Sequence, residues 1–423
     1  MKGDINLLAP NNIQCLVSSP ELKMKQHILV IGAGFGGMWT AISATRLFNI
    51  HDHNNTEVTI LAPQPELRIR PRFYEPNAHT LAAPIGDVLD AVGAKFIKGS
   101  ADSIDVVNKS VGYTDASGNK QTVIYDKLVL ATGSGLALSN TPGVAEHAFN
   151  VDELEQAVRL ENHLKSLVNQ PESQARNTVV VAGGGFTGIE TATEMPTRLR
   201  AILGERADIN VIIVDRGDKV GGSMGPQIAE KIAEASIETG VKWHLSASVV
   251  AVDAGGVTLS DGQRIDAATV VWTTGVRAHS LTEQIPGERD HLGRLHVDDH
   301  LKVIGQDDVY ATGDVAYAAT DDIGNHALMT CQHAIMLGRY AGNNVAAHIL
   351  GVDPMAYRQP KYVTCLDLGA WGAVYTEGWD RQVKLTKQEG KALKTQINTV
   401  WIYPPMADRN VAWAAADPLI PIA

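Results

Sequence analysis

The stretch His27-Ile-Leu-Val-Ile-Gly-Ala-Gly-Phe-Gly-Gly37 decides the fold of this chain. Its first five residues form an apolar, β-branched run that is typical of a buried strand. The turn from Gly32 to Gly37 has the spacing G-x-G-x-x-G and opens a helix-like stretch over 38–48. In such a turn the first glycine makes the bend, the second lets a pyrophosphate approach the backbone, and the third lets helix and strand pack closely. The stretch therefore predicts a dinucleotide-binding unit.

The same pattern occurs a second time. Thr178-Val-Val-Val-Ala182 is followed by Gly183-Gly-Gly-Phe-Thr-Gly188 and a helix-like stretch over 189–203. Each unit then continues into a β-meander and ends in a Thr-Gly pair, at Thr132-Gly133 and at Thr274-Gly275. A single glycine motif arises easily by chance, but a repeat of strand, turn, helix and meander does not. We therefore expect two dinucleotide sites, each with phosphates at a helix N-terminus.

The composition indicates an ordinary globular protein of 423 residues, which at roughly 150 residues per domain means two or three domains. With 44% apolar residues the chain is not disordered, and its net charge of −11 excludes the basic surface that nucleic acids require. Three cysteines without a CxxC motif exclude a disulfide framework, and no cluster of ligand residues predicts a metal site. Residues 26–45 are long enough to span a membrane. Their glycines favour a strand and a turn, so no transmembrane segment is expected.

A third motif, Val309-Tyr-Ala-Thr-Gly-Asp314, follows the second unit. Together with the two glycine motifs it resembles the flavoprotein oxidoreductases in which one domain holds FAD and another holds NAD(P)H. The resemblance implies an α/β fold with two doubly wound, Rossmann-like domains and a small C-terminal α+β interface domain. The expected organisation is an N-terminal arm over 1–25, an FAD-binding domain over 26–145 and 298–345, an NAD(H)-binding domain over 146–297, and the interface domain over 346–423.

The resemblance also assigns residues to the two cofactors. Asp314 would hydrogen-bond the ribityl chain of FAD, and Asp215 would accept a hydrogen bond from the ribose of NADH and disfavour NADPH. Three alternating arginines, Arg68, Arg70 and Arg72, share one side if their segment is extended, and at least one could clamp the adenine or pyrophosphate of FAD. The alternative is a solvated loop with one or two salt bridges. The full FAD set is Gly32, Gly34, Phe35, Gly36, Gly37, Arg70, Arg72, Thr132, Gly133, Gly313, Asp314 and Gln332. The NADH set is Gly183, Gly185, Phe186, Thr187, Gly188, Asp215, Thr274 and Gly275. Ala62 stands in the first unit where an acidic residue is usual.

Within these flavoproteins the chain is most similar to type II NADH dehydrogenases and their quinone-reducing relatives. The similarity lies in Tyr125-Asp-Lys-Leu-Val-Leu-Ala-Thr-Gly133, in the second glycine motif with Glu190, and in Cys331-Gln-His-Ala334. It implies that NADH reduces FAD, which then passes two electrons to a quinone-like acceptor. Three catalytic residues are implied: Glu190 and Gln332 on the acceptor side of the flavin, and Lys394 or its neighbour Lys391 close to it. Met336 stands where quinone reducers often have a second glutamine.

Two other functions stay open. One is a soluble NADH-dependent flavin reductase that feeds a protein electron carrier or a partner oxygenase, and the other is a flavin monooxygenase or redox-sensing flavoprotein. Cys331 and Cys365 are expected to be buried thiols rather than a redox pair. Trp401, Tyr403 and Trp413 favour a domain core or a dimer contact, with a membrane interface as the alternative. We therefore expect a cytoplasmic monomer or homodimer, with peripheral contact to the inner face of a membrane left open.

Overall fold

The first glycine motif lies in a seven-stranded sheet with the order β19-β8-β1-β2-β5-β6-β7. The computed structural model describes residues 25–137 and 139–421, so the predicted N-terminal arm over 1–25 falls outside it apart from Lys25. Strands β19 to β5 of this order are parallel, and β5, β6 and β7 form an antiparallel meander. The strands are β1 (Gln26–Ile31), β2 (Thr56–Ala62), β5 (Lys95–Asp105), β6 (Ser110–Asp115), β7 (Lys120–Ile124), β8 (Lys127–Leu130) and β19 (Val309–Ala311).

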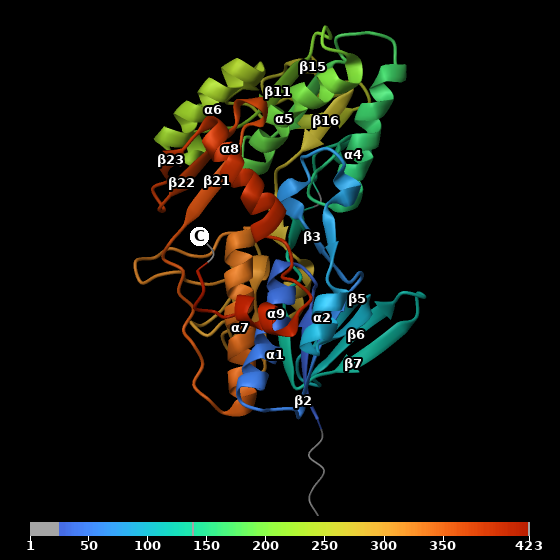
Figure 1. Cartoon of the computed structure of the whole chain (residues 1–423). Helices are drawn as coiled ribbons and strands as arrows, with labels where there is room; N and C mark the ends of the chain where they lie inside the picture. Colours follow the sequence, from blue (N-terminus) through green and yellow to red (C-terminus); the bar gives the residue numbers. More distant parts are fainter. Residues whose placement is uncertain (1–24, 138, 422–423) are drawn as a thin grey trace, which may run out of the picture.

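Two long helices pack on each other beside this sheet (Figure 1). They are α1 (Phe35–Ile50), which the glycine motif opens, and α7 (Cys331–Leu350). The backbones touch, because a Cβ atom added at Gly338 would lie 2.5 Å from the carbonyl oxygen of Gly36. A Cβ atom added at Gly342 would lie 2.2 Å from the carbonyl oxygen of Thr40. Because these two glycines carry no side chain, α7 packs directly against the backbone of α1.

The second unit has a four-stranded parallel sheet with the order β12-β11-β10-β16. The strands are β10 (Thr178–Ala182), β11 (Asn210–Val214), β12 (Val241–His244) and β16 (Thr269–Trp272), and the meander is β13 (Val249–Asp253), β14 (Gly256–Leu259) and β15 (Arg264–Asp266). The helices are α4 (Leu154–Ser166), α5 (Phe186–Leu203) and α6 (Pro226–Thr239). Strands β9 (Ser134–Leu136) and β17 (Val276–Ala278) pair with each other directly after the two Thr-Gly pairs, and so join the units.

The C-terminal residues are divided between the two units. Strands β21 (Val363–Asp367), β22 (Ala373–Glu377) and β23 (Gln382–Leu385) form an antiparallel sheet that, with α8 (Lys387–Gln396), lies against α5 and α6 (Figure 1). In contrast, α9 (Arg409–Ala415) returns to α1 and α2 (Gly86–Val92) of the first unit. The stretch 346–423, expected as one domain, thus packs in two places, and α7 continues to Leu350.

Smaller elements complete the fold. They are β3 (Glu66–Arg68), β4 (Ala82–Pro84), α3 (Val144–His147), β18 (Leu295–His296) and β20 (Ala316–Tyr317). Within the described residues no helix is both long and apolar enough to cross a bilayer. The predicted fold class, α/β with two parallel Rossmann-like sheets, is confirmed. Four of the six residues of β1 and all five of β10 are buried, because helices or meanders cover both faces of a parallel sheet.

Candidate active site at the two glycine motifs

The three glycines of the first motif serve different purposes. Gly32 has a φ of +110°, and a Cβ atom there would lie 2.3 Å from the carbonyl oxygen of Ala131. A Cβ atom at Gly37 would lie 1.9 Å from the carbonyl oxygen of Gly32. Gly34 is exposed, and its added Cβ would meet no described atom within 4 Å. Gly32 and Gly37 are therefore needed by the fold itself, whereas Gly34 leaves room for a ligand above the N-terminus of α1.

The second motif repeats this geometry. Gly183 has a φ of +112°, and a Cβ atom at Gly188 would lie 1.9 Å from its carbonyl oxygen. Gly185 is exposed and, among the described atoms, has open space around its added Cβ. No described side chain caps α1 or α5, so the first N–H groups of both helices are free for phosphate oxygens. The chain thus has two equivalent dinucleotide cradles.

Asp215 lies at the second cradle, directly after β11. Its Oδ2 accepts a hydrogen bond from the backbone N–H of Gly184 at 2.7 Å, and its Oδ1 accepts from that of Gly217 at 2.7 Å. These bonds hold the carboxylate at the rim of the glycine turn and leave lone pairs for a ribose hydroxyl. The matching position at the end of β2 is Ala62, which is buried and offers no such group.

Asp314 belongs to a polar cluster at the first cradle. The hydroxyl of Ser134 donates to its Oδ2 at 2.6 Å. Arg70 donates from Nη1 to Ser134 Oγ at 2.8 Å and forms an ion pair with Asp152 through Nη2. Its Nη1 also lies 3.5 Å from Asp314 Oδ2. The sequence missed Ser134 and Asp152, since neither belongs to a motif; the parallel pairing of β8 and β19 places Ser134 and Asp314 beyond adjacent strand ends.

The prediction that three arginines share one side is wrong. Residues 70–72 form a 3-10 turn with Pro71 in its first positions, which ends the alternation of an extended segment. Arg68 instead pairs with Glu66 and Glu155, and Arg72 pairs with Glu75 and donates to the Tyr403 hydroxyl at 2.9 Å. Only Arg70 of the three contacts the Asp314 cluster.

Buried hydroxyls at the first cradle lack partners. Thr132 follows β8, Thr312 follows β19, and the side-chain oxygens of both are buried with no hydrogen-bond partner among the described residues. A buried hydroxyl without a partner is costly, so a ligand with polar atoms fits this place. Gly133 and Gly313 come directly after these two threonines, beyond the ends of β8 and β19. Thr274 and Gly275 follow β16 in the same way at the second cradle.

Glu190 and Lys394 form a buried ion pair. Lys394 Nζ donates to Glu190 Oε1 at 2.8 Å, and the two side chains are only 9% and 10% exposed. Burial raises the pKa of Glu190 above its usual value, and Lys394 offsets this only in part. Burial opposes the charge of Lys394, but the Glu190 carboxylate outweighs it and raises the pKa of the lysine. The structure thus joins two of the three residues predicted to be catalytic.

The third residue, Gln332, binds the backbone of the same strand, β21, as Glu190 and Lys394 do. Gln332 Nε2 donates to the carbonyl of Val363 at 2.6 Å, Lys394 Nζ donates to that of Cys365 at 2.9 Å, and Glu190 accepts from the N–H of Asp367 at 3.0 Å. Residues 363, 365 and 367 all present these groups on the edge of β21 that faces away from β22. All three side chains therefore bind the free edge of β21, which no sequence motif predicts.

Asp367 extends the ion pair into a network. Lys391 Nζ donates to Asp367 Oδ1 at 2.7 Å, and the Tyr74 hydroxyl donates to its Oδ2 at 3.1 Å. Burial and the nearby carboxylates raise the pKa of Tyr74 well above its ordinary value. Three distant segments of the chain supply these groups, so the sequence contained no local signal for them.

A cavity of about 190 Å³ opens beside Gln332. Its lining contains no carboxylate among the described residues and mixes apolar groups with two cations: Gln332, Met336, Tyr340, Arg358, Gln359, Pro360, Lys361, Val363, Pro418, Leu419 and Pro421. Glu190 does not line this cavity. The prediction that Gln332 and Glu190 flank one pocket therefore holds for Gln332 but not for Glu190. Met336, noted as a departure from quinone reducers, lies in its wall.

The two described cysteines behave as buried thiols. Burial raises the pKa of Cys331 to about 11 and that of Cys365 to about 12, so both are protonated at neutral pH. A thiolate is the nucleophilic form, and neither thiol therefore has the character of a redox-active residue. Both are free in the structure.

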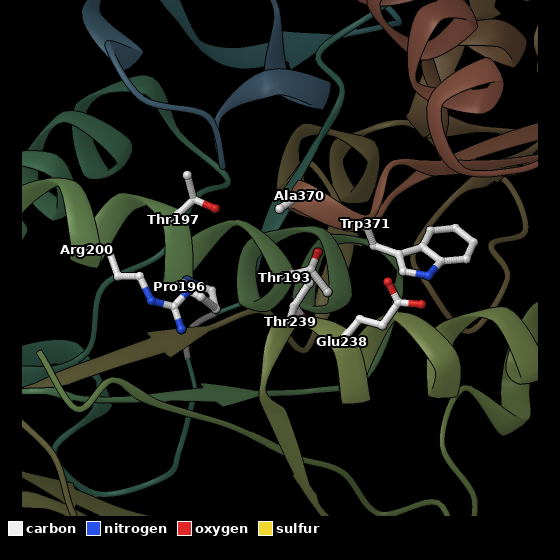
Figure 2. A pocket seen from close by; sticks show the side chains of 8 residues that line it. All are labelled: Thr193, Pro196, Thr197, Arg200, Glu238, Thr239, Ala370 and Trp371. Carbon is white, nitrogen blue, oxygen red and sulfur yellow. The ribbon is translucent and has the colours of Figure 1, made fainter. Parts of the chain in front are cut away.

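A second cavity, of about 140 Å³, lies between α5, α6 and the turn after β21 (Figure 2). Figure 2 shows Arg200 at one end and Trp371 with Glu238 at the other. None of the predicted site residues lines it. This second cavity is therefore separate from the predicted site residues.

Comparison with known proteins agrees with this geometry. The family model described as pyridine nucleotide-disulphide oxidoreductase matches residues 26–338. An NADH dehydrogenase-like protein of Mycobacterium tuberculosis is 43% identical over 400 residues, which are 93% of this chain and 98% of that protein. A demethylphylloquinone reductase of Synechocystis is 28% identical over 83% of this chain and 86% of its own length.

Solved structures show the same fold. The structure of NDH2 from Plasmodium falciparum in complex with NADH matches with a TM-score of 0.76 at 15% identity, covering 93% of this chain and 97% of that chain. The resemblance that the motifs indicate is thus confirmed by sequence and by fold. The chain is an oxidoreductase of the pyridine nucleotide-disulphide oxidoreductase family, among its NADH dehydrogenase-like members.

Proposed function

We propose that this protein is an FAD-dependent enzyme that takes a hydride from NADH and passes two electrons to a quinone-like acceptor. The observation that carries the proposal is the pair of equivalent cradles, each open at its middle glycine, Gly34 and Gly185. Two dinucleotides bound by one chain are what hydride transfer between a nicotinamide and a flavin requires. The names of the relatives, which include an NADH dehydrogenase-like protein and a quinone reductase, support the same reaction.

The residues of the first cradle fit FAD. Gly34 gives room for a pyrophosphate, Asp314 is held by Ser134 for a ribityl hydroxyl, and the Thr132 and Thr312 hydroxyls still need partners. FAD, when bound, supplies the hydride-accepting and electron-donating chemistry. The chain itself binds and orients the two cofactors and holds the buried charges of Glu190 and Lys394 nearby. Burial raises the pKa of Glu190, and a raised pKa makes proton transfer from this carboxyl group easier to reach.

Replacement of Asp215 by alanine should reduce kcat/KM for NADH by roughly 10- to 100-fold, since a hydrogen bond to a charged group contributes about 1.5–3 kcal/mol. The kcat/KM for NADPH should fall less, because the 2′-phosphate cannot donate a hydrogen bond to the carboxylate of Asp215. Steady-state kinetics with ferricyanide as acceptor measure this without involving the quinone site. Asp215→Asn keeps one oxygen for the Gly184 or Gly217 amide and serves as the control. Equal use of both nucleotides by the unaltered enzyme would exclude the proposed role of Asp215.

The acceptor is proposed to bind in the cavity beside Gln332. An amide at the boundary of an otherwise largely apolar cavity can donate to a quinone carbonyl. Gln332→Leu should slow reoxidation of the reduced enzyme by a quinone roughly tenfold, while reduction by NADH keeps its rate. Stopped-flow absorbance at the flavin band resolves the two half-reactions.

The matched control is Gln227→Leu. Gln227 accepts from the N–H of Val383 at 3.0 Å, so this change also removes an amide that binds a strand backbone, but at β23 and outside the cavity. Unchanged reoxidation in both variants, with every quinone tested, would place the acceptor elsewhere. A protein electron carrier would then be the better hypothesis.

A cytoplasmic location at the inner face of a membrane is part of the proposal. It is supported by large apolar side chains exposed near the C-terminus, including Val400, Trp401 and Met406, and co-sedimentation with lipid vesicles tests it. The three-residue aromatic belt considered from the sequence does not form. Tyr403 bonds to Arg72, and Trp413 Nε1 donates to Thr45 Oγ1 at 3.1 Å, so only Trp401 faces outward.

A further inference from the structure

An arginine of the C-terminal sheet lies at the second cradle. The guanidinium carbon of Arg381 is 5.5 Å from the ring centroid of Phe186. Phe186 is the first residue of α5 and directly follows Gly185, the glycine that leaves space for a phosphate. Arg381 itself belongs to the turn between β22 and β23. The second cradle therefore has a charged neighbour that its own βα unit does not supply.

The turn that carries Arg381 is attached to the second unit. Arg381 Nη1 donates to the carbonyl of Ser223 at 3.3 Å, in the loop between β11 and α6. Strand β23 follows directly and contacts α6 (Figure 1). There, Gln227 of α6 accepts from the N–H of Val383 at 3.0 Å. These contacts hold the guanidinium beside the glycine turn, where it is only partly exposed.

The position of Arg381 is unfavourable in the protein alone. Its backbone has a φ of +54°, in the left-handed region that residues other than glycine rarely adopt. Its Nε is buried without a hydrogen-bond partner, and no described carboxylate pairs with its guanidinium. The N-terminus of α5 has a partial positive charge, which repels a cation placed beside it. An anion bound at this end of α5 would offset the repulsion and give the guanidinium an acceptor.

We propose that Arg381 binds the pyrophosphate of NADH together with the N-terminus of α5, so that the turn between β22 and β23 completes the second cradle. The inference rests on the proposed function and deepens it, because it gives the C-terminal sheet a direct contact with the nucleotide. A guanidinium can donate two parallel hydrogen bonds to phosphate oxygens, in addition to those from the free N–H groups of the helix. Arg381 takes no part in hydride transfer.

Binding of NAD+ and of ADP-ribose to the oxidised, FAD-bound enzyme tests this role without turnover. Both ligands contain the pyrophosphate, and only NAD+ contains the nicotinamide. Arg381→Gly should raise the Kd for both ligands at least tenfold, because charge-assisted hydrogen bonds are lost. Arg381→Lys should raise the Kd less, since it keeps the charge but not the planar fork of donors. Isothermal titration measures all of these values.

Two further measurements separate a charge contact from a structural role. The Kd of the unaltered enzyme for NAD+ should rise more steeply with NaCl concentration than that of Arg381→Gly, because salt screens the contact that the variant lacks. Glycine adopts a positive φ without strain. The thermal unfolding midpoint of the FAD-bound, nucleotide-free enzyme should therefore not fall in Arg381→Gly.

The matched control is Lys387→Gly. Lys387 is also a cation with a positive φ, +53°, and its Nζ lies over an aromatic ring, 5.3 Å from the centroid of Trp371. Its partners, however, are Glu234 and Glu238 of α6. Lys387→Gly should leave the Kd for both ligands, and their dependence on salt, unchanged.

The outcomes separate this inference from the proposed function. If the unaltered enzyme binds neither NAD+ nor ADP-ribose, the proposed use of NADH is wrong. If it binds both, and Arg381→Gly changes neither Kd, the proposed function stands and Arg381 does not contact the pyrophosphate. A loss confined to NAD+, a salt dependence equal to that of the unaltered enzyme, or an equal effect of Lys387→Gly would also overturn the inference.

Discussion

Gly34→Val should yield a folded protein that does not retain FAD. An added Cβ atom meets no described atom within 4 Å, and the backbone at Gly34 (φ −69°, ψ −170°) is extended with a negative φ, which a residue other than glycine can adopt. The valine would instead occupy the space of the pyrophosphate. We expect FAD affinity to fall at least 100-fold, about 2.7 kcal/mol. Flavin absorbance per chain after gel filtration measures the loss, and circular dichroism checks the fold.

The repeat supplies a reciprocal control. Gly185 has nearly the same backbone angles (φ −78°, ψ −179°) and the same open space at the second cradle. Gly185→Val should therefore purify with FAD but resist reduction by NADH. If Gly34→Val keeps a full complement of flavin, or if Gly185→Val loses it, the assignment of the two cofactors to the two cradles is wrong.

Lys394→Met should destabilise the protein by about 3–5 kcal/mol at neutral pH, because it leaves the Glu190 carboxylate buried without its partner. Both side chains are at most 10% exposed, so water cannot replace the lost bond. The loss should be measured as a shift of the thermal unfolding midpoint of the FAD-bound enzyme. A surface pair such as Lys231 and Glu234 provides the contrast, since Lys231→Met should leave the unfolding midpoint nearly unchanged.

The size of this loss should depend on pH. Lys394 lowers the pKa of Glu190, so its removal raises that pKa further above the unfolded value of about 4.3. A carboxyl whose pKa is raised by folding stabilises the fold below the unfolded pKa, and this contribution disappears as the pH rises through the folded pKa. The difference in stability between Lys394→Met and the unaltered enzyme should therefore be smallest near pH 5 and largest near pH 8.

The double variant Glu190→Gln/Lys394→Met isolates the ion pair. Because it removes both charges, it should recover much of the lost stability and lose the added pH dependence. A double variant as unstable and as pH-dependent as Lys394→Met would show that Glu190 is not the group responsible.

Local sequence patterns predict much of the fold. The runs 27–31 and 178–182 are apolar and β-branched, and each is followed by a glycine turn, so strand, turn and helix are predictable without tertiary information. Gly37 and Gly188 are each fixed by a hard-sphere contact with the first glycine of the same βα unit, Gly32 and Gly183, which is why the spacing is diagnostic. The repeat of that unit determines that the chain has two dinucleotide cradles, and Asp215 follows from its place after β11.

The candidate site is different, because only tertiary packing assembles it. The alternation of Arg68, Arg70 and Arg72 suggested an extended segment, and Pro71 turned it into a 3-10 turn that brings only Arg70 to Asp314. The free edge of β21 binds Gln332, Lys394 and Glu190, which come from three segments. Pro418, Leu419 and Pro421 complete the cavity beside Gln332. Periodicity and motif spacing report contacts within a few residues. These contacts join residues separated by up to 244 positions, and only the packed chain decides them.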